Sequence, residues 1–258
     1  TLLPDRPSSA HKGDCGRTVI YAGSLGMAGA AMMAARAALH AGAGLTTVIC
    51  PRAAMPVLQQ EVPNATCLAA EDQPTPKCDA LLMGCGIAEN DDTYADMMRL
   101  KATDAYQVWD AGALNLLAGH PQQLGARAVI TPHAGEAARL LGWEIPAVLS
   151  DKLGAAEALR AKYGCNVVLK SAVTVMLTAD GQQCALNAVG SPALAKGGSG
   201  DALAGILASL LGQGLPMFDA MRAACLWLGL AGIAAGKRCG VRAALTGDVI
   251  DSLGACEG

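Results

Sequence analysis

The sequence predicts an α/β fold in which a mostly parallel central sheet is covered by helices on both faces. Three observations carry this prediction: short β-prone runs alternate with alanine-rich helical runs, 52% of the residues are apolar, and glycine-rich or polar turns follow most of the β-prone runs. Such alternation is typical of βαβ units, in which helices join parallel strands. With 258 residues and no segment that resembles a linker, residues 1–258 are expected to form a single domain.

Six β-prone runs give the predicted strands of the parallel part of the sheet. They are residues 18–21, 45–49, 80–83, 107–109, 128–130 and 167–169. A hairpin is predicted next, because residues 174–178 alternate in polarity, residues 179–181 have turn composition and residues 183–186 return. The sheet is therefore expected to become mixed at this margin.

The predicted helices are recognised by apolar residues three and four positions apart. One follows the turn at Gly23 and runs to about His40, a second includes residues 137–141, and a third covers residues 202–211. The longest apolar run, residues 223–235, is too short to cross a bilayer, so it is interpreted as a buried helix. The sequence therefore predicts no membrane span.

Composition excludes several classes of function. A net charge of −3 and an aromatic content of 3% argue against a nucleic-acid partner, which would need a basic surface or stacking rings. The ten cysteines form no C-x-x-C pair and lie in apolar segments, as expected of core thiols in a reducing, cytoplasmic compartment. A zinc site is not expected, because none of the four histidines has ligand spacing from a cysteine pair.

The most informative segment is residues 194–201, Leu-Ala-Lys-Gly-Gly-Ser-Gly-Asp, at the start of the third predicted helix. Its glycines allow the backbone to approach a ligand, and a helix start carries partial positive charge, so the segment predicts a phosphate site. Asp201 beside a bound phosphate could accept a proton from an attacking hydroxyl. The alternative is that Asp201 caps the helix. The glycines and Lys196, which a cap does not need, favour catalysis.

Other turns at the ends of predicted strands offer further candidates. Residues 23–29 have G-x-x-G-x-x-G spacing, and no acidic residue follows the next predicted strand, so an ordinary Rossmann site for NAD is disfavoured. The glycines of this turn could serve either close packing of a helix on the sheet or contact with a ligand, and both interpretations stay open. In residues 131–136, Glu136 could begin a helix or His133 could bind polar substrate groups. Residues 170–174, Lys-Ser-Ala-Val-Thr, could contact nucleotide phosphates or hold a solvated lysine. No Walker A motif is present.

Taken together and in this order, these residues resemble the ADP-dependent NAD(P)H-hydrate dehydratases, a carbohydrate-kinase-like family of the ribokinase-like superfamily. The resemblance runs from His11 to Asp248. It rests on five blocks: His11-Lys12-Gly13 with Gly16, Ala22-Gly23-Ser24 with Gly29-Ala30-Ala31, Asp110-Ala111 with Ala113-Leu114, Thr131-Pro132-His133 with Gly135-Glu136, and Leu194-Ala195 with Gly197-Gly198-Ser199-Gly200-Asp201.

The resemblance implies a ribokinase-like three-layer fold and a repair reaction. Members of this family restore reduced nicotinamide cofactors that have taken up water across a ring double bond. The implied route uses ADP, or ATP in some lineages, together with Mg²⁺. The hydroxyl of the S-epimer of NAD(P)H hydrate is phosphorylated and phosphate then leaves, so the products are NAD(P)H, AMP and phosphate.

The resemblance also implies roles for individual residues. Asp201 is the expected catalytic base. Nucleotide contacts are expected from Lys170, Ser171, Ala172, Val173, Thr174, Gly198 and Gly200. Contacts with the hydrate are expected from Ala30, Gly86, Asp110, His133, Asn187 and Asp201, whereas no metal ligands are identified. Ser171, Ala134 and Cys85 stand where the family usually has Gly, Pro and Pro, and we expect adjusted loops with activity retained.

Two other functions stay open. One is a ribokinase-like kinase that phosphorylates a vitamin-precursor alcohol, and the other is a nucleotide-binding regulator without activity, against which the retained Asp201 argues. The resemblance further implies a homo-oligomer, with a tetramer favoured, and an NAD(P)H-hydrate epimerase as a fused or separate partner. The absent initial Met and the proline-rich beginning fit the carboxyl-terminal half of such a fusion.

Overall fold

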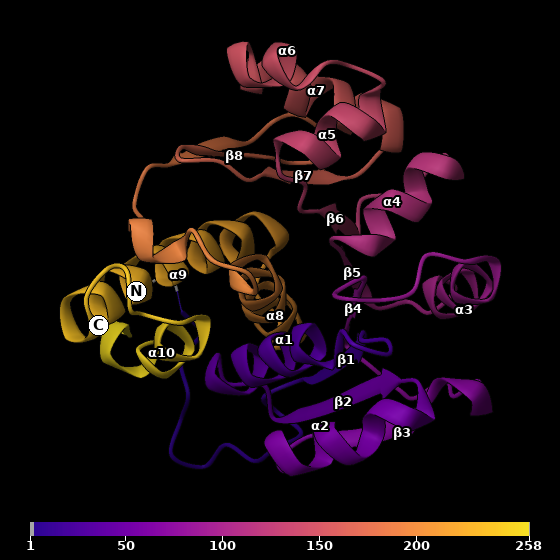
Figure 1. The fold of residues 1–258 in the computed structure, drawn as a ribbon, viewed down its shortest axis with the longest axis vertical. Coiled ribbons are helices and arrows are strands. Elements are labelled where there is room, and N and C mark those ends of the chain that lie inside the picture. The colour runs from indigo at the N-terminus through magenta and orange to yellow at the C-terminus, as the bar shows by residue number, and fades with distance from the viewer. Residues whose placement is uncertain (1–2, 258) are drawn as a thin grey trace.

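The computed structural model describes residues 3–257 and has a nine-stranded sheet at its centre within that range (Figure 1). The strand order is β3-β2-β1-β4-β5-β6-β7-β8-β9. The strands are β1 (Arg17–Tyr21), β2 (Leu45–Cys50), β3 (Thr66–Ala69), β4 (Ala80–Met83), β5 (Tyr106–Trp109), β6 (Ala128–Ile130), β7 (Asn166–Leu169), β8 (Thr174–Leu177) and β9 (Cys184–Asn187). The pairs from β3 to β7 are parallel, whereas β8 is antiparallel to both β7 and β9. This confirms the predicted mixed margin.

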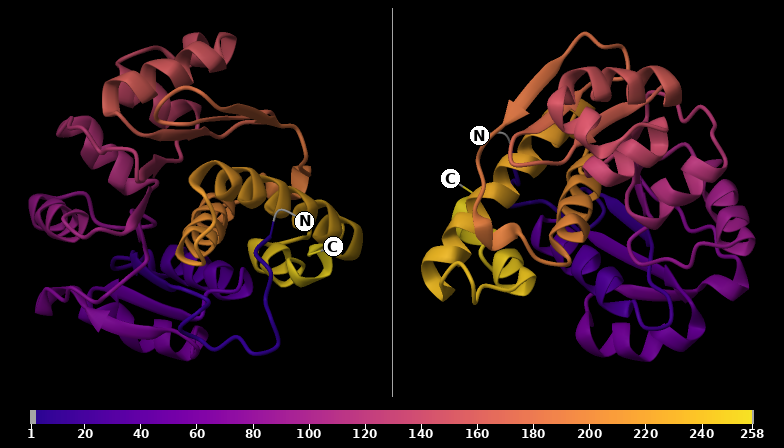
Figure 2. Two further views of the ribbon diagram at one scale, coloured as in Figure 1. Left: turned by 180° about the vertical axis from the view of Figure 1, so that it is seen from behind. Right: turned by 45° about the horizontal axis from the view of Figure 1, so that its top comes forward.

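Helices cover both faces of the sheet, as the sequence predicts (Figures 1 and 2). The helices are α1 (Ala28–His40), α2 (Met55–Glu61), α3 (Asp91–Lys101), α4 (Gly112–Gly119), α5 (Ala134–Leu141), α6 (Ile145–Ser150), α7 (Lys152–Tyr163), α8 (Ser199–Gly212), α9 (Met217–Cys239) and α10 (Thr246–Asp251). Short 3₁₀ turns are η1 (Arg52–Ala54), η2 (Ala70–Asp72), η3 (Pro192–Leu194) and η4 (Gly254–Cys256).

Alternate residues of each strand enter two separate hydrophobic cores. Leu82 packs in the core that contains α1, α8 and α9, whereas its neighbour Leu81 packs in the core that contains α3, α4, α5 and α7. Because both faces are covered, the inner strands are mostly apolar, and β4, Ala-Leu-Leu-Met, is buried at all four positions. This burial explains why the parallel strands could be predicted from short apolar runs.

The sequence analysis does not predict β3. This four-residue strand lies at the edge of the sheet and pairs with β2, and it alternates between more exposed and buried positions. A short edge strand has one neighbour and one half-exposed face, so its residues carry little of the apolar pattern that marks the inner strands.

Helix α8 packs closely on α1 because Gly205 lies against the α1 backbone. A Cβ atom at Gly205 would come within 2.2 Å of the Ala34 carbonyl oxygen. At the far end of α8, a Cβ atom at Gly16 would come within 2.1 Å of the Gly212 carbonyl oxygen. Fourteen helical residues span about 20 Å. The block from His11 to Gly16 therefore lies at the end of α8 opposite to Asp201 and supports the fold.

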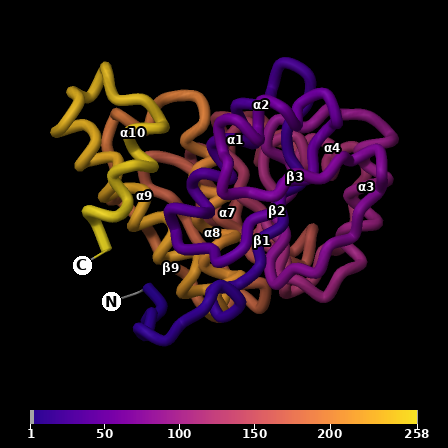
Figure 3. Tube along the Cα trace, turned by 90° about the horizontal axis from the view of Figure 1, so that it is seen from below, coloured from indigo at the N-terminus to yellow at the C-terminus, as the bar shows by residue number. Residues whose placement is uncertain are grey.

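Helix α9 contains the apolar run that the sequence analysis interprets as a buried helix. By length and composition alone it could cross a membrane, but 56% of its apolar window is buried inside the fold, as in a core helix. Ala224, Ala231 and Ala235 are wholly buried in the core shared with α8. The two ends of the described chain lie close together beside α9 and α10 (Figures 1 and 3).

Candidate active site

The predicted site residues converge where β4, β5, β6 and β7 end. The loop with Cys85 and Gly86 follows β4, Asp110 follows β5, His133 follows β6 and Lys170 follows β7. These four strands are parallel neighbours, so their carboxyl ends meet at one edge of the sheet. The first turn of α8 brings Asp201 to the same edge, because a Cβ atom at its neighbour Gly200 would lie 3.7 Å from Asp110 Oδ2.

Asp201 does not cap α8. The N-cap position belongs to Gly198, which has φ +94°, and no side chain caps this end of the helix. Asp201 lies in the first turn and its carboxyl group is largely buried. Burial and the charge of Asp110 raise its pKa to about 6, while a hydrogen bond with Cys85 and the charge of Lys170 act in the opposite direction. A carboxylate with a pKa near 6 is well suited to accept a proton at neutral pH.

Lys170 is the cation of this site and is not solvated, so that alternative is wrong. Its Nζ lies 2.6 Å from Asp110 Oδ1 and 3.9 Å from Glu136 Oε2. Thr131 donates a 2.7 Å hydrogen bond to the same Asp110 oxygen. Burial alone would lower the pKa of Lys170, but the charges of Asp110 and Glu136 outweigh it and raise that pKa. Lys170 therefore stays positively charged inside the protein.

The glycine loop lies directly against this cation. A Cβ atom at Gly200 would lie 3.3 Å from Lys170 Nζ, and one at Gly198 would lie 3.3 Å from Thr246 Oγ1. The Thr246 hydroxyl donates a 2.8 Å hydrogen bond to the Gly197 carbonyl and so fixes the loop. The free N–H groups at a helix start and a buried lysine together provide what a phosphate needs. Lys196, however, points elsewhere and donates to the Arg242 carbonyl.

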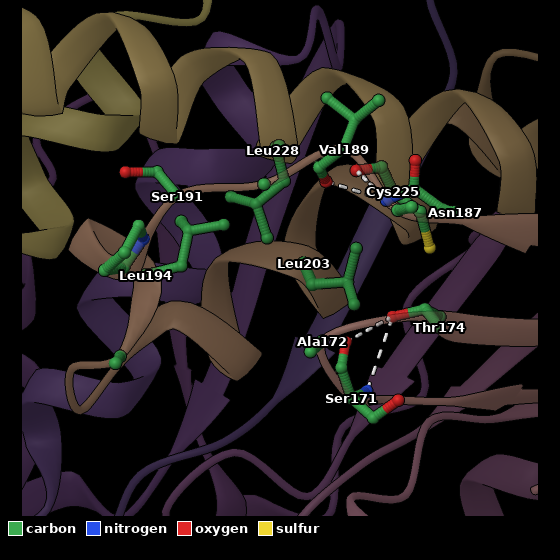
Figure 4. A pocket seen from close by; sticks show the side chains of 15 residues that line it. Ser171, Ala172, Thr174, Asn187, Val189, Ser191, Leu194, Leu203, Cys225 and Leu228 are labelled. Atoms are coloured by element: carbon green, nitrogen blue, oxygen red, sulfur yellow. Dashed lines mark hydrogen bonds between the residues drawn. The ribbon is translucent and has the colours of Figure 1, made fainter.

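A cavity of about 590 Å³ opens between the β7–β8 loop, the segment after β9, and helices α8 and α9 (Figure 4). Ser171, Ala172 and Thr174 line it, so three of the predicted nucleotide residues are brought together, whereas Lys170 and Val173 are not among the lining residues. Asn187, predicted to contact the hydrate, also lines this cavity, where it donates to the carbonyls of Val189 and Cys225. Sequence reasoning missed the apolar lining residues Val189, Leu194, Leu203 and Leu228.

Two other predicted hydrate contacts, Ala30 and Gly86, are brought together. A Cβ atom at Gly86 would lie 2.8 Å from Ala30 Cβ, and Gly86 has φ +65°, so a larger residue would be strained and would push on α1. Gly23 has φ +84° and a Cβ atom there would lie 3.2 Å from Ala31 Cβ, which favours the packing interpretation of that turn.

His133 is the N-cap residue of α5, and its Nε2 lies 3.6 Å from Glu136 Oε1. The helix-start alternative is correct: His133 Nδ1 accepts from the backbone N–H groups of Gly135 and Glu136, and Glu136 accepts from the His133 N–H at 2.7 Å. The side chain is nevertheless 60% exposed. Because Nδ1 is an acceptor, the proton of a neutral ring is assigned to Nε2, which can donate to a ligand.

Cys85, Asp110 and Asp201 could be suspected as a metal site, since their ligand atoms lie within 4.8 Å of one another. Burial and the two carboxylates raise the pKa of the Cys85 thiol well above its usual value, so the sulfur is protonated. Asp110 is already paired with Lys170. Resident Mg²⁺ requires several oxygen ligands, which this group does not supply. Magnesium is therefore better suited to enter this site together with a nucleotide, bound to its phosphates.

A mostly parallel sheet covered on both faces, with a glycine-rich helix start, a buried lysine and a carboxylate at the strand ends, is the architecture of a ribokinase-like protein. A family model described as NAD(P)H-hydrate dehydratase matches residues 18–254. The chain belongs to this NAD(P)H-hydrate dehydratase family, which confirms the resemblance stated from its sequence.

Named relatives agree with this assignment. The chain is 38% identical to the bifunctional NAD(P)H-hydrate repair enzyme of Escherichia coli, covering 98% of this chain and 49% of that protein. It is 34% identical to the ADP-dependent (S)-NAD(P)H-hydrate dehydratase of Neisseria meningitidis, covering 89% and 79%. The ADP/ATP-dependent NAD(P)H-hydrate dehydratase of Bacillus subtilis, co-crystallised with ATP and Mg²⁺, superposes with a TM-score of 0.88 at 26% identity, covering 98% and 93%. The chain spans about half the length of the bifunctional relatives it matches.

Proposed function

We propose that this protein is a hydro-lyase that converts the S-epimer of NAD(P)H hydrate to NAD(P)H and uses ADP as the phosphoryl donor. The observation that carries the proposal is the position of Asp201, a carboxylate with a pKa near 6, beside the glycine loop and the buried Lys170. Family membership supplies the identity of the reaction.

In this proposal ADP occupies the 590 Å³ cavity and its phosphates extend to Gly198, Gly200 and Lys170. Lys170 neutralises negative charge on the transferred phosphoryl group, and Mg²⁺ brought in with the nucleotide would add positive charge at the same place. Asp201 accepts the proton of the hydrate hydroxyl as the oxygen bonds to the terminal phosphorus, and AMP leaves. The carbon–oxygen bond then breaks and phosphate departs with that oxygen. A neighbouring ring carbon gives up a proton, which the departing phosphate can accept, and the double bond reforms.

The hydrate ring is proposed to lie on the surface formed by Ala30 and Gly86. Both positions carry small residues that pack against each other. The ring of His133 is exposed at the carboxyl end of β6, and β5 separates β6 from β4. The Nε2 atom of His133 would donate to the carboxamide of the nicotinamide. Asp110 is proposed to act through Lys170, whereas Asn187 is proposed to contact the nucleotide.

The test mixes the protein with NADH hydrate, Mg²⁺ and either ADP or ATP, and follows both reduced-nicotinamide absorbance and phosphate release. Recovery of absorbance that requires a nucleotide supports the proposal, and the better donor answers the choice between ADP and ATP. Nucleotide binding without recovery, together with a phosphorylated product formed from a small alcohol, would favour the alternative of a vitamin-precursor kinase.

Asp201→Asn provides the matched control. This variant should bind ADP as before, because Asp201 does not line the cavity. Its turnover should fall by about 10² or more if Asp201 is the base. Turnover close to that of the wild type would contradict the assignment of Asp201.

Four broader expectations are part of the same proposal. The first is that residues 1–258 act as one dehydratase domain, and the second is that an epimerase supplies the S-epimer from the other epimer of the hydrate. The third is that the protein works in the cytoplasm. The fourth is that it assembles as a homo-oligomer, with a tetramer favoured. The family assignment supports the first two expectations, and the scattered free cysteines support the third.

A further inference from the structure

The loop between β7 and β8 forms one wall of the cavity in which ADP is proposed to bind. Ser171, Ala172 and Thr174 line the cavity from this side (Figure 4). The Thr174 hydroxyl donates a 3.2 Å hydrogen bond to the Ser171 carbonyl and accepts a 3.5 Å bond from the Ser171 N–H. These bonds join the two ends of the loop, so its conformation depends on what holds the residues between them.

The side chain of Ser171 gives the loop two further hydrogen bonds. Its hydroxyl donates to the Val173 carbonyl. A hydroxyl oxygen can also accept, and this one accepts from the ammonium group of Lys152. The NAD(P)H-hydrate dehydratases usually have glycine at this position, and a glycine could make neither bond. The departure of Ser171 from the family pattern therefore supplies the contact that joins the loop to Lys152.

Lys152 connects the loop to helix α7. It is the first residue of this helix, and its Nζ donates to Ser171 Oγ at 3.4 Å and to the Val173 carbonyl at 3.5 Å. The helix is a firm support, because Ala155 and Leu159 are wholly buried. Within residues 3–257 Lys152 forms no ion pair, so no carboxylate competes with the loop for its ammonium group.

We infer that Lys152 is a positioning residue, which holds the β7–β8 loop through Ser171 and Val173 in the shape that binds ADP. This inference rests on the proposed function, which places ADP in the cavity. Lys152 is not among the residues that line the cavity, so its effect reaches the nucleotide through the loop. Both of its bonds are long, and one hydrogen bond contributes little net free energy, so we expect ADP affinity to change by about 3- to 10-fold.

The first readout is amide hydrogen exchange of residues 171–174 without nucleotide, which reports how firmly the loop is held. Lys152→Met removes the donor and keeps a long side chain, whereas Lys152→Arg keeps a charged donor. Exchange in the loop should be about 3 to 10 times faster in Lys152→Met and close to wild type in Lys152→Arg. Lys162→Met is the matched control and should leave the loop unchanged, because Lys162 lies near the other end of α7 and donates to the Leu140 carbonyl.

The second readout is the Kd for ADP with Mg²⁺, measured by calorimetry. Lys152→Met and Ser171→Gly should each raise this Kd by about 3- to 10-fold. Because the two residues share a hydrogen bond, the double variant should bind ADP more weakly than wild type by less than the product of the two factors. In the repair reaction, the KM for ADP should rise in the same way, while kcat at saturating ADP should stay unchanged. A lysine that only stabilised α7 would change neither the loop exchange nor the Kd.

The outcomes separate this inference from the proposed function. Loop exchange in Lys152→Met equal to that of the wild type overturns the inference, as does an unchanged Kd for ADP. Factors that multiply in the double variant overturn the link through Ser171. A wild-type protein that binds no ADP overturns both the inference and the choice of donor. If loop exchange and Kd change as expected but no variant repairs NADH hydrate, the role of Lys152 stands and the proposed reaction fails.

Discussion

Asp201 meets two opposing demands, because the burial that gives it a useful proton affinity also destabilises its ionised form. The folded pKa of about 6 lies above the ordinary value of 3.8, and burial is the largest cause. A group whose pKa is raised on folding binds its proton more tightly in the folded state than in the unfolded state. Above the folded pKa the protein must therefore hold an unfavourable charge, as is common at catalytic sites.

This argument predicts the pH dependence of stability. Below about pH 4, Asp201 is protonated in both states and contributes nothing. Between about pH 4 and 6 the unfolded carboxyl loses its proton first, so stability falls as pH rises, and above pH 6 the whole penalty of up to about 3 kcal/mol is present. Asp201→Asn should therefore make the metal-free protein more stable at pH 7.

Urea unfolding of wild type and Asp201→Asn at pH 4 and pH 7 measures the effect. The stability difference between the two proteins should be larger at pH 7 by about 1 to 3 kcal/mol. An equal difference at the two pH values would show that the carboxyl group of Asp201 titrates normally. Asp219→Asn is a suitable control, because Asp219 is on the surface far from this edge of the sheet and pairs only weakly with Arg222.

Helix α8 shows how one element fixes the position of the site. Its apolar face was predicted from residues 202–211, and its start was predicted from the glycines that precede them. The depth of α8 in the fold follows from Gly205, which lets the helix approach the α1 backbone. Since the same helix carries Asp201 and Gly200, the distance between α1 and α8 also sets the distance between the hydrate surface and the base.

Replacing Gly205 by Ala should destabilise the protein. The new Cβ would lie 2.2 Å from the Ala34 carbonyl oxygen, so α8 and α1 must separate, at a cost of about 1 to 3 kcal/mol. Gly29→Ala in α1 is the matched control, since no atom lies within 4 Å of its Cβ position and alanine favours the helix by up to about 1 kcal/mol. Thermal or urea unfolding of both variants gives the comparison. Equal stability of the two variants would contradict the close packing of α1 and α8.

Individual elements differ in how far the sequence could predict them. Strands β4 and β7, buried on both faces, appear as uninterrupted apolar runs, whereas the edge strand β3 does not. The double role of residues 131–136 could only be left open, since a histidine that caps a helix and one that faces a ligand have the same sequence. The fold places Cys85 within 4.8 Å of Asp201 although the two residues are 116 positions apart, and a lone cysteine in an apolar segment gives no indication of such a neighbour.

At the scale of the whole molecule, the site is formed by segments that the sheet order brings together. The polar turns after the strands could be predicted to share one edge, because that follows from parallel pairing alone. The cavity could not, because it needs the return of the chain from β9 through η3 to α8 and the placement of α9 across it. For the same reason, it could not be predicted that Asn187 lines this cavity together with Ser171 and Thr174.

Ligand binding by this assembled cavity predicts a stability difference between ADP and adenosine. In the proposed binding mode, adenosine fills the apolar part of the cavity near Leu203 and Leu228. ADP in the same mode also places its phosphates against Gly200 and Lys170, whose Nζ would lie 3.3 Å from a Cβ atom at Gly200. A ligand that binds only the folded protein at 100 times its Kd stabilises it by about 2.7 kcal/mol. At equal millimolar concentrations with Mg²⁺, ADP should therefore raise Tm clearly more than adenosine does.

Lys170→Met is the informative variant for this measurement. It removes the cation but keeps a long apolar side chain. Adenosine should therefore still raise the Tm of this variant, whereas ADP should no longer raise it further than adenosine does. Because Lys170 also neutralises Asp110, the variant is compared with Lys170→Met/Asp110→Asn, which leaves no unpaired buried carboxylate at that position. If ADP still raises the Tm of the double variant as far above the adenosine value as in the wild type, the phosphates do not bind at the start of α8. ADP must then bind elsewhere on the protein.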